Sequence, residues 1–235
     1  MKTVVFWDID GTLLTTGRAG VFALEDAASD VVGRPVQLQS MPTAGLTDRE
    51  IAIAILQNHQ VEPHPDKVDR LLELYADYLP ASLYRKQGAV LQGVRELLEH
   101  LHSREDVLSL LLTGNIRAGA AAKLTHYGLN HFFQDGAFSD RRADRSAIAR
   151  EGLALAQRLL GAISPDQIYV VGDTPHDIRC GKAIGAKVVA VASGSYSLAD
   201  LEEHAPWWAI PTLPEPAIFI QKIGLTDQVR NWPLT

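Results

Sequence analysis

The fold is decided close to the N-terminus, where residues 3–12 read TVVFWDIDGT. The apolar run from Thr3 to Trp7 is rich in β-branched residues and predicts a buried strand. It leads directly into Asp8 and Asp10, so two carboxylates lie at the carboxyl end of that strand, where open α/β sheets bind their ligands. Carboxylates in a partly dehydrated crevice repel each other unless a cation compensates them. The stretch therefore predicts a strand that ends in a metal site.

The acidic pair could instead lie in an exposed turn, or it could open a calcium-binding loop. A calcium loop needs a bidentate Glu at its last position, where this chain has Ala19, and it follows a helix rather than an apolar strand. We therefore favour a strand-end site.

Further apolar runs predict the remainder of a sheet. They lie at residues 107–112, 168–171 and 187–192, with a weaker run at 136–139. These runs alternate with amphipathic helical stripes. The pattern predicts an α/β fold, a Rossmann-like doubly wound parallel sheet with helices on both faces.

Residues 16–87 form a long insert after the first strand and carry several helix signals but no convincing strand. One such signal is the capping box from Thr47 to Glu50. A crossover between parallel strands needs only one helix, so the excess predicts a separate helical domain. We predict an α/β core of residues 1–15 and 88–235 and a helical cap domain of residues 16–87.

A second acidic pair follows the strand predicted at residues 168–171, in the stretch GDTPHD at residues 172–177. Pro175 suits the first turn of a helix, which would bring Asp173 and Asp177 together at the start of that helix. One Asp at a helix N-terminus is usually only a cap, but two acidic pairs after two apolar strands point to a shared site.

The strand predicted at residues 107–112 ends in Thr113-Gly114-Asn115. A hydroxyl group, a glycine that lets the backbone approach, and a helix N-terminus together make a suitable anion-binding loop. Taken alone, Asn115 is more often an ordinary helix N-cap.

With these three stretches, the chain resembles the haloacid dehalogenase superfamily. The motifs DIDGT at 8–12, LLTGN at 111–115 and GDTPHD at 172–177 match in order, spacing and placement, and the resemblance spans Met1 to about Ser197. The insert after the first motif resembles the helical C1-type cap of the phosphoglycolate phosphatase-like subgroup.

The resemblance implies a Mg²⁺-dependent phosphatase that acts on a small phosphorylated metabolite through an aspartyl-phosphate intermediate. Asp8 would be the nucleophile and Asp10 the general acid and base. Mg²⁺ would be held by Asp8, the Asp10 carbonyl and Asp173, with Asp177 supporting that shell. The residues that would bind the phosphoryl oxygens are Gly11, Thr113, Gly114 and Asn115.

The chain departs from the family pattern at the expected lysine before the last acidic motif, because no Lys occurs between Lys123 and Lys182. Arg145 opens the following helix and is our choice for this phosphate-binding cation. Arg141 and Arg142 are expected to be solvated surface charges. Lys123 is expected to face water on its Ala-rich helix.

The insert also contains Gly45-Leu46-Thr47-Asp48-Arg49, which resembles the cap loop that enters the active site in related phosphatases. Thr47 and Arg49 are therefore candidate substrate-binding residues, with Arg49 meeting an acidic group. The alternative is a capped helix whose charges face solvent.

Composition excludes several classes of protein. A net charge of -6 argues against nucleic-acid or anionic-membrane binding, and the single Cys180 excludes an internal disulfide framework. The short apolar N-terminus does not make a signal peptide, so we predict a cytoplasmic protein. We predict no dedicated protein partner. Trp207 and Trp208 in the proline-rich tail are expected to serve packing.

Three alternative functions remain open. A phosphomutase of the β-phosphoglucomutase kind would differ only in what accepts the phosphoryl group. A 2-haloacid dehalogenase would use the same nucleophile but would not need Asp10 or Asp173. A catalytically silent binding protein would have little reason to retain so costly a group of carboxylates.

Overall fold

The computed structural model describes residues 2–38, 41, 43–141 and 144–226. Within these residues, parallel pairing joins the strands of one six-stranded sheet in the order β5-β4-β1-β6-β7-β8. Their bounds are β1 Thr3–Trp7, β4 Val107–Leu112, β5 Gly136–Ala137, β6 Ile168–Gly172, β7 Lys187–Val191 and β8 Trp208–Ile210. The α/β fold with a doubly wound parallel sheet is confirmed.

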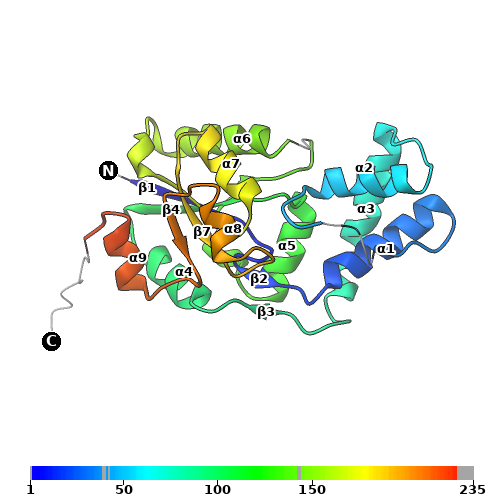
Figure 1. The fold of residues 1–235 in the computed structure, drawn as a ribbon, viewed down its shortest axis with the longest axis horizontal. Helices are drawn as coiled ribbons and strands as arrows, with labels where there is room; N and C mark the ends of the chain where they lie inside the picture. The colour runs from blue at the N-terminus through cyan, green and yellow to red at the C-terminus, as the bar shows by residue number, and fades with distance from the viewer. Residues whose placement is uncertain (1, 39–40, 42, 142–143, 227–235) are drawn as a thin grey trace.

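Helices cover both faces of this sheet, as Figure 1 shows. The face that carries Val5 and Trp7 packs on α4, α5 and α9, and the opposite face, with Val4 and Phe6, packs on α6, α7 and α8. The bounds of these helices are α4 Val94–His102, α5 Arg117–His126, α6 Arg145–Leu160, α7 Pro175–Ala183, α8 Leu198–Glu202 and α9 Pro216–Lys222. Because β1 is buried on both faces, it reads as a continuous apolar run.

Three helices from the predicted insert pack together at one end of the molecule (Figure 1). They are α1 Ala19–Val32, α2 Asp48–Asn58 and α3 Pro65–Ser82. These helices share a hydrophobic cluster, to which α5 is joined through the neighbouring Ile116. The short antiparallel pair β2 (Leu14–Thr15) and β3 (Ala89–Val90) lies where the chain leaves and re-enters the sheet region. The exact division into a core and a cap domain stays a prediction.

Two features differ from the sequence-based expectations. The ladder of β2 and β3 is not predicted, because two-residue strands carry no periodic signal. The edge strand β8 lies in the proline-rich tail, where Trp208 packs against the cluster that contains Phe219. Among the described residues, no helix is long and apolar enough to cross a membrane.

Candidate functional site

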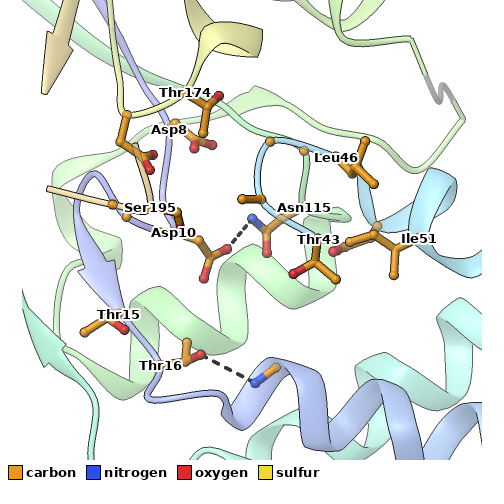
Figure 2. A pocket seen from close by; sticks show the side chains of 18 of the residues that line it. Asp8, Asp10, Thr15, Thr16, Thr43, Leu46, Ile51, Asn115, Thr174 and Ser195 are labelled. Carbon is orange, nitrogen blue, oxygen red and sulfur yellow. Dashed lines mark hydrogen bonds between the residues drawn. The ribbon is translucent and has the colours of Figure 1, made fainter. Parts of the chain in front are cut away.

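The carboxyl ends of neighbouring strands meet at one cavity, as the sheet order requires. Strands β4, β1 and β6 are adjacent, and the segments that follow them line a cavity of about 490 Å³ together with α1 and the segment before α2. Residues from all three predicted motifs therefore face one space, as Figure 2 shows for Asp8, Asp10, Asn115 and Thr174.

Three buried carboxylates form the acidic side of this site. Ligand oxygens of Asp8, Asp173 and Asp177 all lie within 4.8 Å of one another. Burial, and then the negative charge of Asp177, raises the pKa of Asp8 to about 7, and the same two causes raise the pKa of Asp173 well above its ordinary value. Three hard oxygen donors so close together fit a small divalent cation such as Mg²⁺. The side chain of Asp10 lies outside this cluster of three.

Two glycines allow the backbone to approach this cluster. A Cβ atom on Gly11, which has a φ of 84°, would lie 2.3 Å from an oxygen of Asp173. A Cβ atom on Gly194 would lie 1.7 Å from the same oxygen. Any larger side chain at either position would displace Asp173.

Arg145 supplies a buried positive charge to the carboxylates. Its Nη2 atom pairs with Asp177 and lies 3.6 Å from Asp8 Oδ1, and its Nη1 atom donates to the carbonyl oxygen of Gly45 over 3.3 Å. Burial alone would lower the pKa of this guanidinium, but the attraction of Asp177 and Asp8 outweighs burial and raises it. Arg145 is thus a buried cation beside Asp8, and its role in place of the family lysine stays a proposal.

Asp177 organises the start of α7 as well as the charge cluster. Its carboxylate accepts the backbone N–H of Thr174 over 3.0 Å and also the Thr174 hydroxyl, which completes a capping box. With this cap and with Arg145, Asp177 is 1% exposed and has several partners. The same carboxylate therefore links the helix to the site.

The expectation that Lys123 faces water is wrong. The side chain is buried, and its ammonium group lies 2.5 Å from Asp10 Oδ2 and 2.5 Å from Asn115 Oδ1. Burial would lower the pKa of Lys123, but the attraction of Asp10 and other nearby acidic groups outweighs it and raises this pKa. Lys123 shares one face of α5 with Ala120 and Leu124, which are also buried. This spacing is the signal that could have revealed it.

Asn115 is a bridge rather than a helix cap. Its side-chain amide donates to Asp10 Oδ2 and to the Thr113 hydroxyl, in each case over 2.9 Å (Figure 2 draws the first). The N-cap of α5 is Ile116, whose N–H is instead accepted by Asp48 of α2 over 2.8 Å. The alternative that Asn115 is an ordinary N-cap is therefore wrong.

The predicted phosphate-binding residues line the cavity, with one exception. Gly11, Gly114 and Arg145 line the cavity together with Asn115. Thr113 is 1% exposed and is not among the lining residues, yet its hydroxyl accepts a hydrogen bond from Asn115. Their roles toward phosphate stay proposals.

The two candidate substrate residues of the cap do not line the cavity. Thr47 is buried and caps α2 in the predicted box with Glu50. Arg49 donates to Asp69 over 2.5 Å and to the carbonyl oxygen of Asp140 over 2.6 Å. Their neighbours Leu46 and Asp48 face the cavity instead.

Further residues that are not part of the three motifs also line the cavity. Ser193 and Ser195 flank Gly194 shortly after β7, and the Ser193 hydroxyl donates to the carbonyl oxygen of Gly11 over 2.7 Å. Small polar residues after a buried strand were the available signal.

Arg141 is exposed, as expected, while Arg142 lies outside the described residues.

The family is now established by comparison with known proteins. The model of the haloacid dehalogenase-like hydrolases matches residues 5–191. The chain belongs to this family. Probable phosphatase IndB of Dickeya dadantii is 28% identical to it over 224 residues, 92% of each chain. Pyrophosphatase PpaX of Halalkalibacterium halodurans is 26% identical over 229 residues, 92% of this chain and 94% of that one.

Solved structures of the haloacid dehalogenase-like family share the fold. A predicted phosphoglycolate phosphatase from Haemophilus somnus superimposes with a TM-score of 0.69 at 17% identity, covering 94% of this chain and 98% of its own. At this identity the likeness concerns the fold alone.

We expect Lys123→Met to slow hydrolysis of alkyl phosphates by about 100-fold, because Asp10 loses the ammonium that orients it. Esters with a good leaving group, such as p-nitrophenyl phosphate, need less protonation and should be slowed far less. Steady-state kcat for both substrate types measures this difference. Equal losses on both types would contradict a positioning role for Lys123, and the exposed Lys2→Met variant is the control.

Proposed function

We propose that this protein is a Mg²⁺-dependent phosphoric monoester hydrolase that acts on a small phosphorylated metabolite through an aspartyl-phosphate. The observation that carries the proposal is the juxtaposition of Asp8 with Asp173 and Arg145 at a cavity that also exposes Asp10. A nucleophile, a cation site and an acid–base group thus converge where a phosphoryl group would bind. A cytoplasmic location stays a prediction.

In the proposed reaction, a carboxylate oxygen of Asp8 forms a bond to phosphorus as the bond to the alcohol oxygen breaks. Asp10 donates its proton to that leaving oxygen. Asp10 then takes a proton from water, the water oxygen attacks phosphorus, and the bond to Asp8 breaks to release phosphate. Arg145 balances negative charge on Asp8 and the phosphoryl oxygens throughout.

Asp8 and Asp173, with the carbonyl of Asp10, would hold Mg²⁺, and Asp177 would support them. Bound there, Mg²⁺ would neutralise charge on the carboxylates and on the phosphoryl oxygens. The buried oxygen donors and their raised pKa values support this assignment.

The test is phosphate release from a panel of sugar phosphates, nucleotides and small phospho-acids, with Mg²⁺ and with EDTA. We expect release that depends on Mg²⁺. Absence of release from every ester would contradict the proposal. Transfer of the phosphoryl group to a sugar phosphate, without free phosphate, would instead establish the phosphomutase alternative.

Mg²⁺ should stabilise the protein more at about pH 7.5 than at about pH 5. Burial raises the pKa of Asp8 from 3.8 to about 7. Between pH 3.8 and about pH 7, the metal-free native state therefore binds more protons than the unfolded chain. Its stability therefore falls as pH rises through this window, and a cation that replaces the proton restores it. Thermal midpoints measured with Mg²⁺ and with EDTA at both pH values test this. An increment that is larger at the lower pH would contradict it.

A further inference from the structure

The wall of the cavity away from the carboxylate cluster is largely apolar. Helix α1 contributes Val21 and Leu24, and the segment that leads into α2 contributes Leu46, followed by Ile51 within the helix. Figure 2 shows Leu46 and Ile51 on one side of the pocket, across from Asp8. A phosphoryl group on Asp8 would place the rest of the substrate toward this wall.

Neutral hydroxyl groups provide most of the polar atoms on this side. Thr15, Thr16, Thr43 and Tyr75 all line the cavity. A hydroxyl group both donates and accepts, so it can meet an uncharged alcohol or carbonyl group of a ligand. A hydroxyl group supplies no positive charge to balance an acidic group that a substrate carries in addition to its phosphate.

The two cations that line the cavity, within the part of the chain that the structure describes, are already engaged by carboxylates. Lys123 directs two of its three protons to Asp10 and Asn115. Arg145 pairs with Asp177 and lies beside Asp8. The sequence has no Lys or Arg between Arg34 and Arg49, so the segment before α2 adds no positive charge.

The remaining charge on the cap side is negative. Asp48 lines the cavity and is 7% exposed, and burial raises its pKa to about 6 despite the opposing attraction of Lys123. Mg²⁺ held by Asp8 and Asp173 would offset the charge of those two carboxylates, but Asp48 is not among its proposed ligands. A second acidic group on the substrate would thus lie near the Asp48 carboxylate with no unengaged cation among the described residues that line the cavity, which is costly.

We infer that the substrates are phosphate monoesters of uncharged alcohols, and that the cavity discriminates against phosphate compounds with a second acidic group. This inference rests on the proposed phosphatase function and narrows its substrate class. It separates the chain from the pyrophosphate and phosphoglycolate that the names of its relatives mention.

The experiment compares three esters of nearly equal size that differ in the group at the far end. Hydroxyethyl phosphate is neutral there, phosphoglycolate carries a carboxylate, and phosphoethanolamine carries an ammonium group. We expect kcat/KM for hydroxyethyl phosphate to exceed that for phosphoglycolate by about tenfold or more. p-Nitrophenyl phosphate reports whether the protein hydrolyses phosphate esters at all.

A matched pair of variants tests whether the cap wall causes this preference. Val21 lines the cavity in the first turn of α1 and is half-buried, so a longer side chain can extend into the space. Val21→Arg adds a cation, whereas Val21→Gln adds an uncharged polar side chain that is shorter. The Arg variant should raise the ratio of kcat/KM for phosphoglycolate over hydroxyethyl phosphate by about tenfold relative to the Gln variant.

The relative kcat/KM values for these esters decide whether the substrate inference holds. A preference for hydroxyethyl phosphate that Val21→Arg shifts toward phosphoglycolate supports the inference. Equal or better hydrolysis of phosphoglycolate by the unaltered protein overturns it while leaving the phosphatase function intact. A preference for phosphoethanolamine also overturns it and indicates that Asp48 binds a cation. If none of the esters is hydrolysed, p-nitrophenyl phosphate included, the proposed function itself fails and the inference with it.

Discussion

Asp8→Asn should reduce phosphate release by at least about 10⁴-fold, because the amide cannot form the bond to phosphorus that the proposed mechanism requires. The substitution keeps the shape of the side chain, so substrate binding should change much less than kcat. Mass spectrometry of the protein quenched during turnover should show a phosphoryl adduct in the unaltered protein and none in the variant.

The same substitution should leave the fold intact and even stabilise it. Burial and the charge of Asp177 raise the pKa of Asp8 to about 7, which means that the ionised carboxylate destabilises the metal-free native state at neutral pH. The neutral amide removes this repulsion, so the thermal midpoint in EDTA should equal or exceed that of the unaltered protein. Unchanged turnover in pure, folded Asp8→Asn protein would remove Asp8 from the mechanism.

Arg145→Met should abolish most activity and also destabilise the protein. The side chain is 9% exposed and pairs with Asp177, which is 1% exposed, so its loss leaves buried carboxylates without their cation. Breaking such a buried pair costs about 3–5 kcal/mol. We expect kcat to fall by about 10³-fold, because charge on Asp8 and on the transferring phosphoryl group is no longer balanced.

Two controls separate charge from packing at this position. Arg145→Lys keeps the positive charge but not the planar fork, so it should recover part of kcat. Arg141→Met removes an exposed arginine from the preceding segment and should change neither kcat nor the midpoint of urea unfolding. Full activity in Arg145→Met would show that Lys123 alone supplies the required cation.

Much of the fold was predictable from local sequence. The observed bounds of β1 and β4 are those predicted, because a central strand of a parallel sheet covered by helices is apolar at nearly every position. The capping box of Thr47 with Glu50 was predicted because its hydrogen bonds involve residues three apart. The edge strand β8 was missed, because it is short and its pairing with β7 depends on residues far away in the chain.

The candidate site was also predictable from the sequence only in part. The sequence by itself determined that Asp8, Asp10 and Asp173 follow buried strands, and therefore that they meet at one edge of the sheet. Only the tertiary structure decided how positive charge is distributed among them. The spacing of Lys123 with Ala120 and Leu124 indicates a shared helix face, but only the packing of α5 in the tertiary structure brings that face to Asp10. Which cation compensates which carboxylate depends on distances between elements far apart in sequence, and local pattern does not encode those distances.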